Sequence, residues 1–379
     1  MDFSWNNEQR AVREAALDFA RKELGGISAD FSRERWRKCV RFGVLGLPFP
    51  AAHGGTGQDI FTTVLTMEGL GAGCRDNGLL FALNAQMWSV QQPLATLGSS
   101  VQKEKYLPRL ITGEIIGAHG MTEPQSGSDA YGLRTTAEKA PGGYILNGCK
   151  TLITNAPVAD LAIVFANTNP QRGMWGLTAL LVERGAPGFE LGAPVEKMGL
   201  HGAAMGEMRL ENCFVPEENR LGGEGAGARV FESSMEWERS CILACQVGAM
   251  ERQLEECVQR ARERRRFGQP IGNFQSVSHR IADMKVRLET ARLLLYQTAW
   301  RKHQGLSAVM EAAIAKLYLS EAFATSGLDA IRTFGGEGYL TGCGVEQDLR
   351  DAIGGLLYSG TSDIQRNIIA HRLGLGGKA

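Results

Sequence analysis

Residues 161–182 read LAIVFANTNPQRGMWGLTALLV, two short runs of largely aliphatic residues with a segment rich in turn residues between them. Runs of this length and composition, bounded by Asn, Pro and Gly, are typical of β-strands. A similar run at 144–146 follows the pair Gly142-Gly143. We therefore expect a β domain of barrel or sandwich type, which we place at residues 114–225.

The segments on both sides of this β region have a helical period. Before it, apolar residues recur at helical spacing, as at Val12, Ala15 and Phe19. After it, one apolar stripe steps alternately by four and three positions through Val277, Ile281, Met284, Leu288, Ala291 and Leu295. Such a stripe favours the core of a helical bundle over a coiled-coil seam. The sequence thus predicts an α+β protein with helical domains at residues 1–113 and 226–379.

Composition and charge exclude several classes of protein. The 379 residues include 41 basic and 41 acidic side chains, so no global field attracts nucleic acid or an anionic membrane. No run approaches the ~18 apolar residues of a membrane span, and the acidic N-terminus is unlike a signal peptide. The eight cysteines lack metal-ligand spacing. We expect a cytoplasmic protein with reduced thiols and without a metal, nucleic-acid or membrane partner.

Two motifs of the β region are rich in hydroxyl groups and glycine. Residues 121–129 read MTEPQSGSD and residues 146–155 read LNGCKTLITN. At strand ends, such hydroxyls and backbone N–H groups can bind a flat ring with many acceptors, such as an isoalloxazine. By composition alone, ordinary turns are the more common interpretation.

Three further motifs lie in the C-terminal region. Residues 264–275 read RRRFGQPIGNFQ, and the planar fork of arginine suits a pyrophosphate, although a basic run at a helix end is usually solvated. Residues 332–339 read RTFGGEGY and residues 358–366 read YSGTSDIQR. Their glycines allow a phosphate or ring to approach the backbone closely, but alone they would indicate loops.

Together and in this order, the motifs resemble those of the acyl-CoA dehydrogenase family over essentially the whole chain. The resemblance implies an N-terminal helical domain, a middle β domain and a C-terminal four-helix bundle. It implies FAD held between the β domain, the bundle and a neighbouring subunit, so we expect a homo-oligomer, most simply a tetramer. The implied activity is oxidation of the Cα–Cβ bond of an acyl thioester.

The resemblance also implies roles for individual residues. Met121 and Thr122 would meet the flavin ring, and Ser128 would lie close to both the cofactor and the thioester arm. Leu152 and Thr154 would flank the ring, although a tryptophan is common at the position of Leu152.

The remaining cofactor positions lie in the C-terminal motifs. Arg332 replaces a glutamine found in relatives near the adenosine pyrophosphate. Matches to positions that contact the FAD of the partner subunit, or to the last cofactor-binding turn, are Arg264, Phe267, Gln275, Arg332, Gly335, Gly336, Thr361 and Asp363.

The usual catalytic base is missing from the terminal motif. Removal of the weakly acidic Cα proton of a thioester requires a positioned carboxylate and donors for the enolate oxygen. In many family members a glutamate follows the tyrosine that matches Tyr358, whereas this chain has Ser359. A serine hydroxyl is too weakly basic to act alone. The backbone N–H of Ser359 could still polarise the thioester carbonyl together with a ribityl hydroxyl of FAD.

A replacement for the base is Glu238. In the isovaleryl and long-chain branches the base precedes an arginine on the first helix of the bundle, as Glu238 precedes Arg239. The apolar segment 241–250 suggests a dry environment, where the pKa of a carboxyl rises. Glu236 lies on a different helix face and is the weaker candidate. Hydride transfer to flavin N5 would follow proton removal, and we expect substrate contacts from Ser128, Arg239 and Tyr358.

The motifs look most like the branch that acts on acyl or aminoacyl groups tethered to carrier proteins in natural-product pathways. Prolyl-carrier-protein dehydrogenases and flavoproteins of extender-unit formation belong to it. The leading hypothesis is therefore a dehydrogenase of a thioester on an acyl or peptidyl carrier protein, with a separate electron acceptor. The alternatives are a dehydrogenase of free short or branched acyl-CoA, and an inactive flavin-binding scaffold.

Overall fold

A computed structural model describes residues 5–375 of the chain. The N-terminal part is helical, as its periodicity predicts. Its α-helices are α1 (Asn7–Phe19), α2 (Arg33–Phe42), α3 (Ile60–Gly73), α4 (Asn77–Ala85), α5 (Gln92–Leu97) and α6 (Ser100–Ile111). A π-helical segment, η4 (Gln86–Gln91), joins α4 to α5. Side-chain oxygens of Asn6 and Ser99 cap α1 and α6 by accepting hydrogen bonds from the N–H groups of Gln9 and Gln102, and each cap is completed by the reciprocal bond of a capping box.

The middle part is a β domain. Its strands are β1 (Gly117–Gly120), β2 (Thr136–Ala140), β3 (Gly143–Thr154), β4 (Leu161–Asn167), β5 (Leu177–Glu183), β6 (Phe189–Leu191), β7 (Met205–Pro216) and β8 (Arg220–Leu221). The sheet order is β6-β7-β3-β2-β4-β5-β8, with β1 parallel to β4.

The aliphatic runs at 161–182 form the antiparallel pair β4 and β5. Alternate residues of β4 face two different cores. Ala162 and Val164 join the core within the β domain, whereas Ile163 and Phe165 join the larger core shared with the helices. Burial on both faces explains why these strands are continuously apolar rather than alternating.

The C-terminal part is helical again. It contains α7 (Gly227–Cys241), α8 (Ala244–Glu263), α9 (Gln275–His303), α10 (Val309–Phe334), α11 (Val345–Gly355) and α12 (Ser362–Arg372), with the short pair β9 (Arg265–Arg266) and β10 (Gln269–Pro270) between α8 and α9. The predicted stripe on α9 is buried at Met284, Leu288, Ala291 and Leu295. The predicted fold class is confirmed. No helix between residues 5 and 375 is long and apolar enough to cross a membrane.

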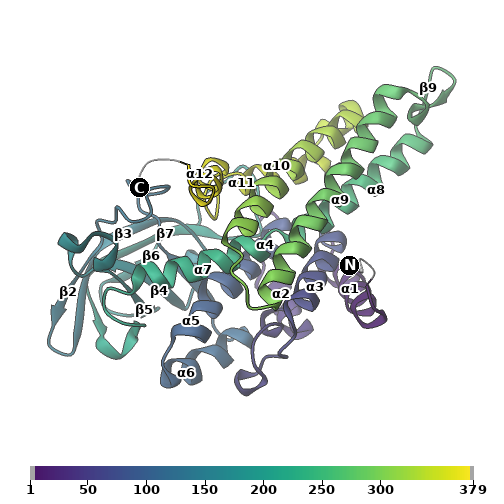
Figure 1. The fold of residues 1–379 in the computed structure, drawn as a ribbon. Helices are drawn as coiled ribbons and strands as arrows, with labels where there is room; N and C mark the ends of the chain where they lie inside the picture. The colour runs from purple at the N-terminus through teal and green to yellow at the C-terminus, as the bar shows by residue number, and fades with distance from the viewer. Residues whose placement is uncertain (1–4, 376–379) are drawn as a thin grey trace.

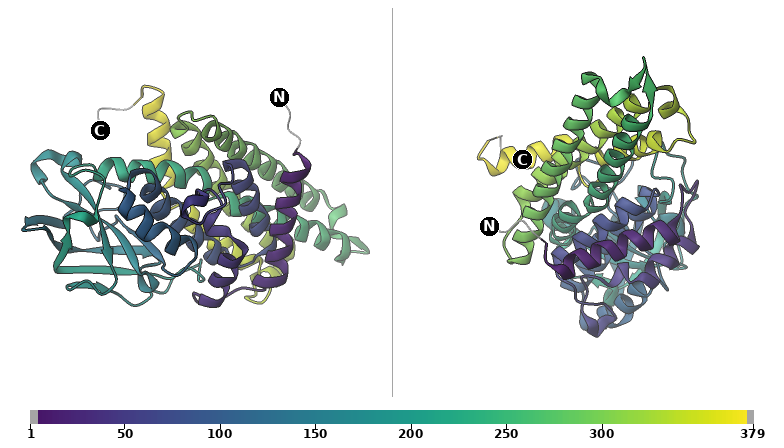
Figure 2. Two further views of the ribbon diagram at one scale, coloured as in Figure 1. Left: turned by 90° about the horizontal axis from the view of Figure 1, so that it is seen from below. Right: turned by 90° about the vertical axis from the view of Figure 1, so that its right-hand side faces the viewer.

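The molecule is elongated (Figures 1 and 2). The β domain lies at one end, and the α8–α9 hairpin extends towards the other, with β9 at its tip. The helices α3 and α8 cross closely at Gly71. A Cβ atom on this residue would lie only 1.8 Å from the carbonyl oxygen of Cys245 on α8. Any larger residue at Gly71 would push the two helices apart.

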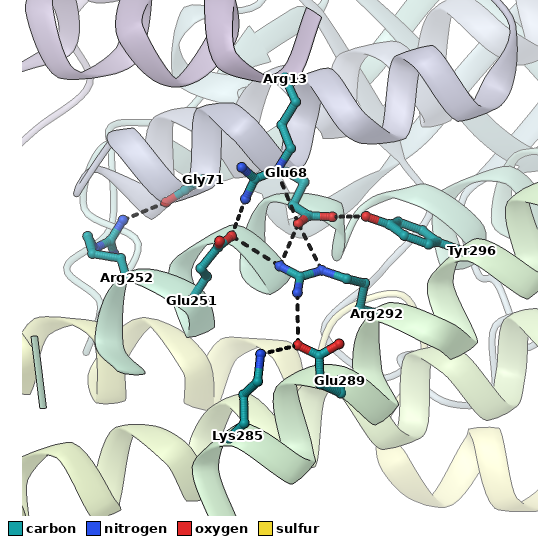
Figure 3. A network of polar contacts seen from close by, with 9 residues as sticks. All are labelled: Arg13, Glu68, Gly71, Glu251, Arg252, Lys285, Glu289, Arg292 and Tyr296. Carbon is teal, nitrogen blue, oxygen red and sulfur yellow. Dashed lines mark hydrogen bonds and ion pairs between the residues drawn. The ribbon is translucent and has the colours of Figure 1, made fainter. Parts of the chain in front are cut away.

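A buried polar network joins the N-terminal helices to the C-terminal ones beside this crossing (Figure 3). Fully buried Glu68 on α3 accepts hydrogen bonds from Arg292 (2.8 Å) and from Tyr296 (2.6 Å), both on α9. Arg13 on α1 pairs with Glu68 and with Glu251 on α8. Four helices from the two ends of the sequence are therefore fixed to one another by charge-assisted hydrogen bonds.

Candidate active site

Glu238 is buried where three parts of the chain meet. It is only 7% exposed on α7. The hydroxyl of Ser89, on η4, donates a hydrogen bond to its Oε2, and the hydroxyl of Ser359, in the turn after α11, donates one to its Oε1. Both carboxylate oxygens are thus held by neutral donors.

The surroundings of Glu238 suit a general base. Burial raises the pKa of its carboxyl above the usual range, while the two serine hydrogen bonds and the positive charges of Arg239 and Lys316 act in the opposite direction. A carboxylate with a raised pKa is a stronger base and can accept a proton near neutral pH.

The π-helical segment η4 sets the position of Ser89. Its neighbour Trp88 stacks on Trp237, with ring centroids 5.9 Å apart and an angle of 4° between the planes. Lys302 lies over the other ring of this pair, with Nζ 4.1 Å from the Trp237 centroid. The contact of Trp88 with Trp237 and the adjacent contact of Ser89 with Glu238 hold η4 against α7. Short π-helical segments of this kind often occur at functional sites.

The turn that carries Ser359 is held in an uncommon conformation. Ser359 has φ of 56°, in the left-handed region. Its carbonyl oxygen accepts hydrogen bonds from Arg239 Nε at 2.9 Å and from Gln365 Nε2 at 3.1 Å. Strained backbone of this kind clusters at functional sites. Partly buried Tyr358 accepts a hydrogen bond from Gln246 and packs on Phe81, with centroids 4.4 Å apart. In this structure Arg239 therefore supports the turn.

A backbone hydrogen bond joins the two β-domain motifs for which the resemblance implies flavin contacts. The backbone N–H of Thr151 on β3 bonds to the carbonyl of Thr122 at 2.9 Å, which joins the two motifs. The register of β3 shifts between Lys150 and Ile153, and Leu152 has φ of 56° and is 60% exposed. The irregularity turns this apolar side chain outwards, two positions before Thr154 and next to Thr151, whose N–H bonds to Thr122. An apolar surface bordered by hydrogen-bonding groups fits a flavin ring.

A buried ion pair supports this surface from behind. Lys150 Nζ lies 2.7 Å from Glu123 Oε1, and both side chains are buried. Glu123 also accepts hydrogen bonds from the backbone N–H groups of Arg134 and Thr135, at 2.7 Å and 3.0 Å. Burial alone would raise the pKa of Glu123, but the Lys150 ammonium and these donors lower it to about 2.

The second group of predicted cofactor residues lies at the far tip of the α8–α9 hairpin (Figure 1). Phe267 is 93% exposed there, with φ of 49°. Glu337 joins this tip to the glycine turn at the end of α10 through Arg260 (2.8 Å) and Arg264 (3.5 Å). Open space lies beside Gly335 and Gly336. Arginines next to an open glycine turn fit a pyrophosphate.

The two groups lie in different parts of the elongated molecule, since β3 belongs to the β domain and β9 marks the tip of the α8–α9 hairpin. Of the remaining candidates, Thr361 caps α12 through the N–H of Ile364, at 3.3 Å. Asp363 is exposed and pairs with Arg366 at 3.0 Å, and Arg332 pairs with Asp329 at 3.4 Å. Ser128, in the β-domain motif at residues 121–129, and Gln275, at the start of α9, are both exposed.

Comparison with known proteins identifies the class. The N-terminal, middle and C-terminal domain models of acyl-CoA dehydrogenase match residues 6–114, 118–213 and 225–374. The chain belongs to the acyl-CoA dehydrogenase family and is an FAD-dependent oxidoreductase.

Within this family the chain is similar to enzymes that act on aminoacyl groups attached to carrier proteins. It is 42% identical to an L-prolyl-[peptidyl-carrier protein] dehydrogenase of Pseudomonas fluorescens, over 99% of this chain and 100% of the relative. The solved structure of the prolyl acyl carrier protein oxidase AnaB matches with a TM-score of 0.96 and 49% identity, over 98% of this chain and 100% of AnaB. PigA with FAD and proline matches with a TM-score of 0.96 and 42% identity over the full length of both chains.

Two residues near Glu238, Ser89 and Lys316, are not predicted from the sequence. Ser89 comes from the N-terminal helical part, 149 positions before Glu238, and Lys316 lies on α10 within an ordinary helical pattern. A serine in an apolar helix and a lysine between an alanine and a leucine carry no motif. Only the three-dimensional contacts reveal them.

Proposed function

We propose that the protein oxidises an aminoacyl thioester, most specifically a prolyl group on a peptidyl carrier protein. The observation that carries this proposal is the buried carboxylate of Glu238. It accepts hydrogen bonds from Ser89 and from Ser359, and Ser359 has the sequence position at which many family members have a glutamate. The similarity to prolyl-carrier-protein enzymes over the full chain supports the choice of substrate.

In the proposed reaction, Glu238 takes the proton from Cα of the thioester. The backbone N–H of Ser359 polarises the thioester carbonyl, which stabilises the negative charge on its oxygen. The β-domain surface with Thr122 and Leu152 would hold FAD, which when bound supplies the oxidant for the hydride leaving Cβ. Loss of the Cα proton and the Cβ hydride leaves a Cα–Cβ double bond. Conversion of a prolyl ring to a pyrrolyl ring removes four hydrogens, so it would need a second two-electron oxidation elsewhere in the ring, and an electron acceptor must take up two electrons for each oxidation.

The test of this proposal compares two carriers of one acyl group. Anaerobic bleaching of the flavin absorbance is followed with prolyl-carrier protein and with prolyl-CoA. We expect rapid bleaching with the carrier protein and much slower bleaching with CoA. Equal or faster bleaching by CoA thioesters would instead assign the protein to free acyl-CoA, and absence of bleaching with any thioester would leave only a flavin-binding scaffold.

We further propose a homo-oligomer, a tetramer being the expected form, in which the hairpin tip of one subunit completes the FAD site of another. The separation of the two cofactor-facing groups supports this arrangement. Sedimentation of the FAD-loaded protein tests it, and a stable FAD-loaded monomer would refute it.

A further inference from the structure

Lys316 is a buried cation to which the reaction above gives no role. Its side chain lies on α10 and is fully buried. Within residues 5–375, its Nζ atom has no hydrogen-bond partner. Lysines are almost never fully buried unless they are paired, because an unpaired ammonium away from water has a large desolvation cost. A lysine kept in such a place therefore calls for an explanation.

The groups around Lys316 belong to the active site. Its Nζ lies 6.0 Å from the ring centroid of Tyr358, the residue before Ser359. The pKa of Lys316 is lowered to about 8, because burial and, next, the charge of Arg239 lower it more than the carboxylates of Glu238 and Glu321 raise it. At neutral pH the amine is therefore mainly an ammonium.

Of the two carboxylates that act on Lys316, only Glu238 is buried. Glu321 is partly exposed and has its own partner, Arg366, at 3.7 Å. The neighbouring cation Arg239 is also engaged, since its Nε donates to the carbonyl of Ser359. The charge of Lys316 is thus available to one buried anion, which is the predicted base.

We propose that Lys316 is a positioning residue for the reaction: its ammonium group balances the negative charge of Glu238 in its buried position and keeps that side chain ready to accept the Cα proton. The two serine hydroxyls orient the carboxylate but carry no charge. An opposite charge nearby is what favours the ionised form of a buried acid. This inference rests on the proposed role of Glu238.

The test measures proton removal without turnover. A (methylthio)acetyl thioester can lose its Cα proton, but the sulfur that replaces Cβ has no hydride to give. Its enolate, stacked on oxidised flavin, forms a long-wavelength charge-transfer band. The band appears as the pH rises through the apparent pKa at which Glu238 and the bound ligand together lose one proton. It is titrated on the carrier protein with the FAD-loaded wild type and with the variants Lys316→Met, Lys316→Gln and Lys316→Arg.

We expect Lys316→Met and Lys316→Gln to move the midpoint of the band upwards by about one pH unit, which is about tenfold less enolate below the midpoint. Lys316→Arg retains the charge and should stay near the wild type. The matched control is Lys38→Met, which removes a partly buried lysine on α2, one that pairs with Glu23 at 3.4 Å and with Glu34 at 3.6 Å. Its midpoint should not change.

Unchanged midpoints in both neutral variants, with normal FAD content, would overturn the proposal. An upward shift in Lys316→Arg as large as in Lys316→Met would also overturn it, because packing rather than charge would then be responsible. If the band forms only with the CoA thioester, the substrate assignment fails, but the same titration on CoA still decides the role of Lys316.

Discussion

The hydroxyl of Ser359 donates a hydrogen bond to Oε1 of Glu238, although the two residues lie 121 positions apart. The position of the family's terminal glutamate and the position of the proposed base on α7 are therefore direct neighbours. We propose that a carboxylate from either position can serve the same site.

The first prediction concerns the base. Glu238→Gln keeps the size of the side chain but removes its ability to accept a proton. Because a positioned general base contributes about 10² to 10⁴ in rate, flavin reduction by prolyl-carrier protein should slow by that factor. Stopped-flow absorbance measures this rate. Normal FAD content is the required control, and turnover equal to the wild type would contradict the assignment.

The second prediction concerns the two hydroxyl donors. Ser359→Ala and Ser89→Ala each remove one hydrogen bond to a charged group, worth about 1.5–3 kcal/mol. Each variant should raise the pKa seen in the pH profile of flavin reduction and lower the rate near neutrality by about tenfold. Ser240→Ala is the matched control, since Ser240 is also buried on α7 but donates to the carbonyl of Glu236. Equal effects in all three variants would argue against a specific role.

The third prediction exchanges the partners. Glu238→Ser should abolish most activity, and the double variant Glu238→Ser with Ser359→Glu should recover about tenfold or more of the lost rate, because a positioned carboxylate is restored. The comparison is made in the same flavin-reduction assay. A double variant no better than Glu238→Ser would show that the two positions are not interchangeable.

Much of this site follows from the sequence because it depends on local patterns. The apolar stripe on α9 and the apolar runs of β4 and β5 predict which faces of these elements are buried. The Glu238-Arg239 pair and the terminal motif carry the resemblance.

The rest depends on which elements meet in space. Ser89 reaches Glu238 only because η4 is packed on α7 through Trp88 and Trp237. The outward turn of Leu152 depends on a shift of register in β3. No local propensity encodes a contact between residues 149 positions apart or the register of one strand on another, so these features had to be observed.

The fourth prediction concerns the network of Figure 3. Glu68→Gln leaves the largely buried guanidinium of Arg292 without its main carboxylate partner. Loss of one partner of a buried pair costs about 3–5 kcal/mol. The free energy of unfolding, measured with urea, should fall by this amount. Glu289→Gln is the control, because Glu289 is exposed and its pairs with Lys285 and Arg292 should contribute less than about 1 kcal/mol. Equal losses would refute the importance of burial.

The fifth prediction concerns acid stability and the support of the flavin surface. Glu123 has a pKa of about 2 in the folded protein, whereas an unfolded glutamate titrates near pH ~4.3. As the pH falls through this window, the unfolded state binds a proton that the folded state does not, so stability is lost. Above about pH 4.3 the contribution is fully present.

Glu123→Gln should therefore be less stable than the wild type at pH 7, because Lys150 stays buried without its carboxylate partner. The difference should shrink as the pH falls from about 5 towards 3, since only the wild type has this titrating group. Urea unfolding at several pH values measures it, with the exposed Glu138→Gln on β2 as the control. Parallel curves for Glu123→Gln and the wild type would mean that the Glu123 carboxylate is not held ionised by Lys150. The flavin surface would then owe its shape to the backbone hydrogen bonds of Arg134 and Thr135 instead.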